Sequence, residues 1–432
     1  MALILLVQPA RMAAMLRRLF ICTLLMFCCT VLPAAAQDSL LLHYRYVRNY
    51  IPDLPRKREM NGLYRNQMIE LRDEIVAANH HGHEMPCSSQ ILEEARWLMN
   101  STGNRAGVER RLADLRASLK HYDQSYAFEQ QPGDGGWGRC FTAWYLRLHA
   151  SVDPLKEMLV SGTAPRHPFR LLEPVNTPEK MRALLKSMLV SDLAADGNDH
   201  RKELNLTITA LAQLLFLPRM ETVLPHDLPR DALAAALRDF IDNEWQDPDT
   251  GFWGAWYKVG DEIRRTNDLS ITFHVISYRQ DSPPRMRQLA DTLFAIRTQR
   301  YPYGWRDQGT QNNHHAYDVV RLLRRAWPEM TEEQRRRSEA ELAIMLARSL
   351  GVSIDDGGRF VDEPYNSVAE AYYFGVSFLD EIGFFRKSQR FWTPLSLTDP
   401  ESLRQALIGN ISRLDPANPM ASAAIRKLQA RD

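Results

Sequence analysis

Apolar residues recur at helical spacing in a series of separate segments. In residues 230–241, Leu233, Leu237, Phe240 and Ile241 fall on one face, as in an amphipathic helix that packs against a core. We predict such helices at residues 178–193, 230–241, 286–296 and 332–350. After each come a glycine-containing turn, a polar loop and a more apolar helix, predicted at residues 203–216, 268–278, 315–327 and 367–379. Strand patterns are scarce, so the sequence predicts an all-α fold.

The glycine turns repeat with a period of about 53 residues. The glycines that mark them are Gly136, Gly197, Gly251, Gly304 and Gly357. The first interval is 61 residues, and the next three are 54, 53 and 53. An aromatic residue follows most of these turns, at Trp137, Trp253, Trp305 and Phe360. A fixed period of this length is typical of one helix pair repeated along the chain.

Repeated helix pairs can build an open superhelix or a closed double ring of inner and outer helices, the (α/α) toroid. The glycine–aromatic turns with long polar loops favour the toroid, with about five to six helical hairpins. We assign residues 131–390 to its core. Residues 37–130 form an N-terminal helical region, with helices predicted at 61–78, 89–99 and 108–121, and residues 391–432 a C-terminal helical closure.

The first 36 residues have the features of a signal peptide. Arg17 and Arg18 precede an apolar run, and Ala34, Ala35 and Ala36 fit a cleavage site before Gln37. We therefore expect a periplasmic or secreted protein with no stable membrane span after cleavage; the alternative is an uncleaved anchor, for which the apolar run is short.

Export changes how the cysteines are interpreted. Only Cys87 and Cys140 follow the predicted cleavage site. In an oxidising compartment they can form one disulfide, and the alternative is two buried free thiols.

The composition excludes several classes of function. Lys and Arg number 54 against 53 Asp and Glu, which is not the basic excess of a nucleic-acid-binding protein. Two cysteines and the absence of an HExxH motif argue against a structural zinc site, and phosphate-binding loops are also missing. We expect no metal and no cofactor.

The Gly-Trp turns followed by inner helices resemble the repeat of the terpenoid-cyclase-like proteins. These proteins belong to the six-hairpin toroids, together with the (α/α) glycosidases and the toroidal polysaccharide lyases. The resemblance covers residues 130–390 and implies a cleft at the mouth of the ring. The acidic Asp-x-Asp-Asp motif of squalene-type cyclases is absent, so the resemblance favours the carbohydrate-active members.

The run Gln311-Asn312-Asn313-His314-His315-Ala316-Tyr317-Asp318 precedes an inner helix. Elimination from a uronate needs a group that stabilises charge on the C6 carboxylate, a base for the C5 proton and a donor to the leaving oxygen. The run is similar to the Asn-Asn-His…Tyr motif of alginate-lyase-type toroids. That resemblance implies that Asn313 holds the carboxylate and His314 is the base. We take Tyr317 as a third catalytic candidate and His315 as a substrate-binding one. The family has one more residue before the Tyr-Asp pair and a small residue at the position of His315, which leaves the role of Tyr317 open. The alternative is that the polar residues cap the helix.

A second candidate group follows Gly251. Trp256 and Tyr257 are suited to stacking on sugar rings, and Arg264 or Arg265 to pairing with a carboxylate. Asp268 is an acid or a helix N-cap. By contrast, the repeated aromatic at Trp253 is expected in the core. Arg139 could line the same mouth.

A third group follows Ser353. We expect Asp355 and Asp356 to form a turn, and Glu363 and Tyr365 to be substrate-binding candidates. These carboxylates support the main alternative to a lyase, an (α/α) glycoside hydrolase that uses two of Asp249, Asp268, Asp355 and Glu363. A third possibility is a non-catalytic glycan-binding or cell-envelope assembly protein. The sequence thus favours a lyase that cleaves a uronate-containing polysaccharide.

Overall fold

We describe a computed structural model of the chain. It describes residues 50–81, 83–260, 262–279, 281–306, 311–355, 357–361, 365, 367–397, 399–414 and 418–430. The predicted signal peptide and Glu363 lie outside these residues. The chain divides into two compact units between Arg285 and Met286. We call them the N-terminal unit (residues 50–285) and the C-terminal unit (residues 286–430) and describe each separately.

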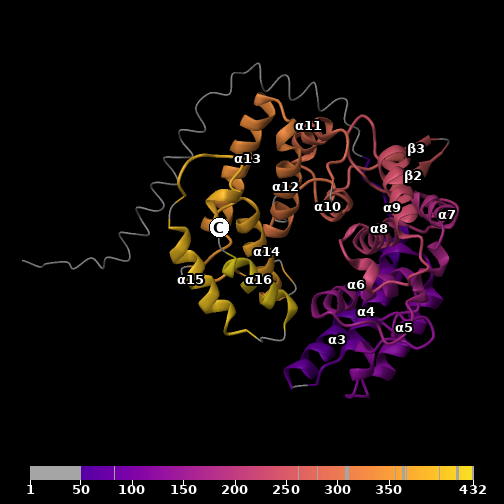
Figure 1. The fold of residues 1–432 in the computed structure, drawn as a ribbon. Helices are drawn as coiled ribbons and strands as arrows, with labels where there is room; N and C mark the ends of the chain where they lie inside the picture. Colours follow the sequence, from indigo (N-terminus) through magenta and orange to yellow (C-terminus); the bar gives the residue numbers. More distant parts are fainter. Residues whose placement is uncertain are drawn as a thin grey trace, which may run out of the picture. The chain divides into compact units, whose positions relative to one another are not determined.

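The N-terminal unit consists mainly of helices (Figure 1). They are α3 (Pro55–His80), α4 (Pro86–Ser101), α5 (Arg105–Ser118), α6 (Trp144–Ser161), α7 (Pro178–Leu189), α8 (Arg201–Phe216), α9 (Arg230–Asp239) and α10 (Leu269–Tyr278). α6 packs on α8 and α8 on α10, while α7 packs on α9, so alternate helices form two layers. α3, α4 and α5 pack together ahead of them.

The C-terminal unit repeats the same alternation. Its helices are α11 (Met286–Ile296), α12 (Asn313–Ala326), α13 (Glu332–Gly351), α14 (Val368–Glu381), α15 (Pro400–Ile411) and α16 (Pro419–Gln429). α12, α14 and α16 lie side by side, and α11, α13 and α15 alternate with them along the chain (Figure 1). The predicted helices therefore exist, and the mostly helical fold class is confirmed. The closed ring, and the domain boundaries at residues 130 and 390, stay predictions.

A short sheet interrupts the helices in the polar loop after Gly251. Strand β1 (Val190–Ser191) pairs in parallel with β2 (Trp256–Val259), which pairs antiparallel with β3 (Glu262–Arg265). These strands were not predicted from the sequence, because the segment is rich in polar residues and carries no clear alternation. The hairpin places Trp256 directly opposite Arg265.

Two glycine turns of the repeat share one hydrogen-bonding arrangement. Nε2 of Gln130 donates to the carbonyl of Gly135 (2.8 Å), and Nε2 of Gln246 donates to that of Gly251 (2.9 Å). Each glutamine also donates to a carbonyl 37 or 38 residues further along. Gly135 and Gly251 have φ values of 69° and 70°, in the left-handed region that favours glycine. These two turns therefore have the same structure.

The aromatic residues after these turns belong to the core. Trp137, Trp253, Trp305 and Phe360 are all buried. The backbone N–H of Trp253 donates to Oγ1 of Thr272 (3.1 Å), and that of Trp137 to Oγ of Ser151 (2.9 Å). Each hydroxyl lies on the helix that follows, so the turn is tied to that helix. The expectation that Trp253 is a core residue is confirmed.

Cys87 and Cys140 form a disulfide with a Cα–Cα distance of 5.4 Å. It links α4 to the loop before α6, so the disulfide alternative holds rather than the free thiols. Buried Glu94 of α4 also contacts this loop: it pairs with Arg111 of α5 (3.1 Å) and accepts the backbone N–H of Thr142 (2.9 Å). In the part of the chain that the structure describes, no helix is long and apolar enough to cross a membrane.

Candidate functional site

The start of α12 carries the residues of the Asn-Asn-His run. Asn312 is the N-cap, and its side chain accepts the backbone N–H of His315 at 3.0 Å. The capping alternative therefore holds for Asn312. Asn313, His314 and Tyr317 do not cap the helix. They lie within its first turns, with His314 and Tyr317 on one face.

His314 is partly accessible. Its side chain retains 34% of its exposure, and its ring stacks on that of Phe374 from α14, with centroids 4.1 Å apart. Nε2 lies 3.8 Å from Oδ2 of Asp318, one turn further along α12. Burial lowers the pKa of His314 to about 4, while nearby Glu370 opposes this shift. The imidazole is therefore neutral near pH 7 and can accept a proton.

His315 lies deeper and has a structural environment. Its ring stacks on Tyr301, with centroids 4.0 Å apart and planes inclined by 6°. Its Nδ1 atom is buried without a hydrogen-bond partner among the described residues. Burial first, and then the neighbouring His314, lower the pKa of His315 to about 3. A substrate-binding role for His315 stays a prediction, but the ring is mostly covered.

Tyr365 closes the start of α12 from the loop before α14. Its hydroxyl accepts the backbone N–H of Asn313 at 2.8 Å. Burial raises the pKa of Tyr365 to about 12, although this N–H and the Asn313 side chain favour the phenolate. The phenol is thus protonated near neutral pH, and because its oxygen accepts a hydrogen bond, its own proton is available to donate.

The amide of Asn313 is the second polar group at this point. The residue is buried, and its Nδ2 atom has no hydrogen bond of acceptable geometry within the described chain. A buried amide donor without a partner is costly unless a ligand supplies an acceptor. The start of α12 therefore carries a buried amide at Asn313, a neutral imidazole at His314 and, hydrogen-bonded to the Asn313 backbone, the protonated phenol of Tyr365.

Tyr317 lies one turn beyond His314 on the accessible face of α12. Burial raises the pKa of its hydroxyl. Nζ of Lys427, from α16, lies 5.7 Å from the centre of its ring. The structure therefore places Tyr317 beside a basic group, one helical turn beyond Asn313.

Three residues near this group were given no role from the sequence: Asp318, Tyr301 and Phe374. The hydroxyl of Tyr301 donates to Oδ2 of Asp318 (2.8 Å), and Asp318 is almost completely buried. Asp318 belongs to the same run, four residues after His314, so helical spacing could have identified it. Tyr301 and Phe374 come from other segments, and only the fold brings them to His314.

The β2–β3 hairpin gathers the second candidate group in the N-terminal unit. The guanidinium of Arg265 lies over the Trp256 ring, 4.5 Å from its centre, and also pairs with Asp247 (3.2 Å). Arg264 lies over Tyr50 at 5.7 Å. Trp256, Arg264 and Arg265 are at least partly exposed, so they form an accessible aromatic and cationic surface.

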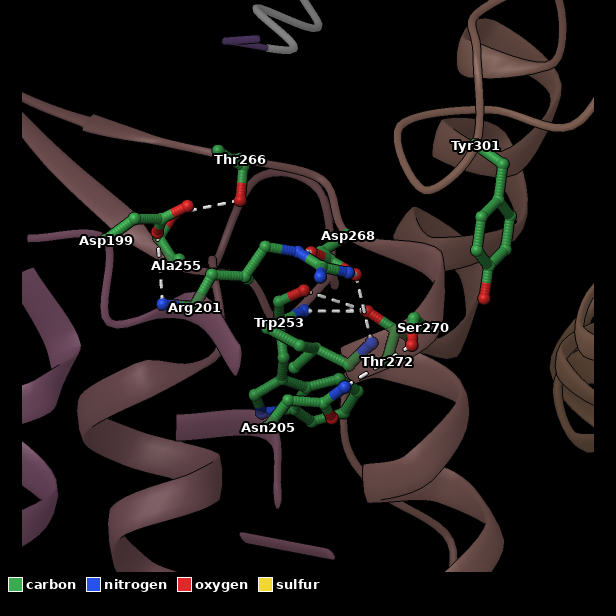
Figure 2. A network of polar contacts seen from close by, with 12 residues as sticks. Asp199, Arg201, Asn205, Trp253, Ala255, Thr266, Asp268, Ser270, Thr272 and Tyr301 are labelled. Atoms are coloured by element: carbon green, nitrogen blue, oxygen red, sulfur yellow. Dashed lines mark hydrogen bonds and ion pairs between the residues drawn. The ribbon is translucent and has the colours of Figure 1, made fainter. Parts of the chain in front are cut away.

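Tyr257 and Asp268 differ from their neighbours because both are fully buried. The Tyr257 hydroxyl donates to Asp199 at 2.8 Å. Asp268 N-caps α10 by accepting the N–H of Ile271 (3.0 Å) and pairs through both oxygens with Arg201 (Figure 2). Neither side chain has a surface for a substrate in this structure, and the N-cap alternative holds for Asp268.

The remaining candidates lie apart from these groups. Arg139 is exposed, with its guanidinium 5.0 Å from the centre of the Tyr126 ring. Asp355 forms the expected turn: its carboxylate accepts the backbone N–H groups of Gly357 and Arg359, both at 2.9 Å. Among the described residues, no group of three or more His, Cys, Asp or Glu side chains is arranged to hold a metal ion.

Comparisons with known proteins add no assignment. No protein-family model, no curated protein and no solved structure matches the chain.

Proposed function

We propose that the chain is an exported polysaccharide lyase that cleaves a uronate-containing polymer by β-elimination at the start of α12. The observation that carries the proposal is the unpartnered amide of Asn313 beside the neutral imidazole of His314 and the phenol of Tyr365. These three groups match the three demands of the reaction. The predicted signal peptide places the activity in the periplasm or outside the cell.

Each group has one role. The Asn313 amide donates to the C6 carboxylate and stabilises the negative charge that builds there as C5 loses its proton. A ring nitrogen of His314 takes the C5 proton. The electron pair of the C5–H bond forms the C4=C5 double bond, and the bond between C4 and the glycosidic oxygen breaks. The leaving oxygen takes the hydroxyl proton of Tyr365.

The nitrogen that acts as base depends on the tautomer of His314. A proton on Nε2 faces Asp318, at 3.8 Å, and leaves the lone pair of Nδ1 for the substrate. Asp318 is thus a positioning residue, held in turn by the Tyr301 hydroxyl. Tyr365 replaces Tyr317 as the proton donor in this proposal, because it adjoins Asn313 directly.

The glycosidase alternative has less support among the described carboxylates. Asp268 is bound to Arg201 and Asp355 to its own turn, while Asp249 is exposed. The non-catalytic alternative does not explain why a buried amide lacks a partner next to two proton-transfer groups. Each alternative predicts products that differ from those of a lyase.

The test is to incubate residues 37–432 with alginate, polygalacturonate, hyaluronan and a neutral glucan. Absorbance near 235 nm measures unsaturated ends, and a reducing-sugar assay measures all new ends. A lyase raises both signals in equal number on a uronate polymer. A hydrolase raises reducing ends alone, and a binding protein raises neither; either result contradicts the proposal.

A further inference from the structure

A cluster of basic side chains lies further along the accessible face of α12. Arg321 and Arg324 both pair with Glu381 of α14, each at 2.7 Å. Arg386, which follows α14, pairs with Asp380 at 2.7 Å. All of these side chains are mostly buried. The pairs use both carboxylates of the cluster.

Lys427 adds a further positive charge to this cluster from α16. Its ammonium group forms no ion pair or hydrogen bond with any residue in the described part of the chain, and its one ring contact is with Tyr317, at 5.7 Å. Burial lowers the pKa of Lys427, which the charges of Asp380 and Glu381 oppose. Asp380 and Glu381 pair with the three arginines, and buried Asp318 acts on Tyr317 from α12, so Lys427 is the cation of the cluster without an ion pair among the described residues.

A partly buried positive charge without an ion pair, such as that of Lys427, is unfavourable unless an anion balances it. The balancing charge must reach Lys427, whose position over the Tyr317 ring leaves the donors of its ammonium unused. The aromatic ring beside it suits the apolar face of a sugar. The cluster is therefore complementary to an anionic carbohydrate.

The cluster also has a defined position relative to His314. His314, Tyr317 and Arg321 lie three and four residues apart on one helix face, and all three are partly exposed. At about 1.5 Å per residue, Arg321 lies roughly 10 Å along the helix axis from His314. An extended acidic oligosaccharide bound at His314 can therefore bring another of its sugars to the cluster.

We propose that Tyr317, Arg321 and Lys427 form a second subsite, which binds the carboxylate of a sugar further along the chain from the one at His314. This proposal rests on the proposed function for its choice of ligand. It names the substrate class more closely: a polymer with consecutive acidic sugars rather than one with isolated uronates. Lys427 supplies the charge that the protein leaves unbalanced.

The test is calorimetric titration of the His314→Ala chain, which prevents turnover, with tetramannuronate and tetragalacturonate. The neutral mannose tetramer is the matched ligand, since it lacks only the carboxylates. We expect Lys427→Gln to weaken binding of an acidic tetramer about tenfold, as for loss of one charged hydrogen bond. Lys427→Arg should restore most of the affinity, and the neutral tetramer should bind weakly to every variant.

Lys387→Gln is the matched control. Lys387 is exposed, and its replacement removes the same charge from the same unit. An equal loss in both variants would show a general effect of charge and overturn the subsite, as would unchanged affinity in Lys427→Gln or failure of every acidic tetramer to bind. Binding that depends on Lys427 without any unsaturated product would retain the subsite and reject the lyase. If the chain forms unsaturated product but Lys427→Gln binds the acidic tetramers with normal affinity, the lyase is retained and the subsite is rejected.

Discussion

Nε2 of His314 lies 3.8 Å from Oδ2 of Asp318, and the same oxygen accepts the hydroxyl proton of Tyr301 at 2.8 Å. The buried carboxylate thus faces the imidazole proposed as the base and is itself oriented by a phenol. A carboxylate at this distance can stabilise the imidazolium that forms when His314 takes a proton.

Asp318→Asn should therefore lower kcat about 10- to 100-fold with little change in KM. The amide keeps the size of the side chain but removes the charge that stabilises protonated His314. Steady-state kinetics at several pH values measure this effect. The pH profile should shift as well, because the apparent pKa of the base falls without the carboxylate. A loss of activity with an unchanged profile would point to a purely structural role.

Buried His315 should make the free energy of unfolding depend on pH. The pKa of His315 is about 3 in the folded chain, below its ordinary value near 6.5. The unfolded chain therefore binds more protons between these values, and the free energy of unfolding falls as the pH drops from 6.5 towards 3. For His315 alone we expect a loss of about 2–3 kcal/mol by pH 4.

His315→Phe should remove this part of the pH dependence. Phenylalanine can keep the stack on Tyr301, and the His315 Nδ1 atom has no hydrogen bond to lose. Urea unfolding of both proteins at pH 7 and pH 4 gives the difference. If the variant loses as much stability as the original chain over this range, His315 is not the group responsible.

Arg201 is expected to matter for stability because Asp268 depends on it. Asp268 is fully buried and pairs with Arg201 through both oxygens (Figure 2). Arg201→Met leaves a buried carboxylate without its cation, which should cost about 3 kcal/mol or more. Lys258→Met, which breaks an exposed pair with Asp192, is the control and should cost less than about 1 kcal/mol. Similar losses in the two variants, measured by urea unfolding, would contradict the assignment.

Reduction of the Cys87–Cys140 bond should destabilise the N-terminal unit. The two cysteines are 53 residues apart in the sequence, and a loop of that length corresponds to about 2–4 kcal/mol of stability. A double Cys87→Ala, Cys140→Ala variant should unfold at a lower urea concentration than the oxidised chain. The oxidised chain after treatment with dithiothreitol should match the variant. Free thiols detected in the native protein would contradict the pairing.

Helix positions could be predicted well from the sequence because their apolar stripes are local. The predicted helix at residues 286–296 coincides with α11 (Met286–Ile296), and that at 332–350 differs from α13 (Glu332–Gly351) by one residue. The core role of Trp253 also followed from its repetition. The short strands were missed, since a paired edge such as Trp256 with Arg265 depends on partners in space.

The candidate site could be predicted only in part. Asn313 and His314 were identified from their run of residues, and the structure confirms that they lie at the start of a helix. Tyr301 and Phe374 were not, because they reach His314 from distant segments. Asp268 shows the opposite case: its polarity suggested chemistry, but its position before a helix makes it a cap and a partner for Arg201.

The central claim is that His314 removes the proton from a uronate, and one comparison tests it most directly. Residues 37–432 and the His314→Ala variant are incubated with the uronate polymer that the original chain cleaves, and the absorbance near 235 nm is followed. His81→Ala is the control, since His81 is exposed at the end of α3. We predict that His314→Ala loses at least a hundredfold in rate while its free energy of unfolding stays within about 0.5 kcal/mol of the original. A folded His314→Ala variant that forms unsaturated product at the original rate would contradict the account.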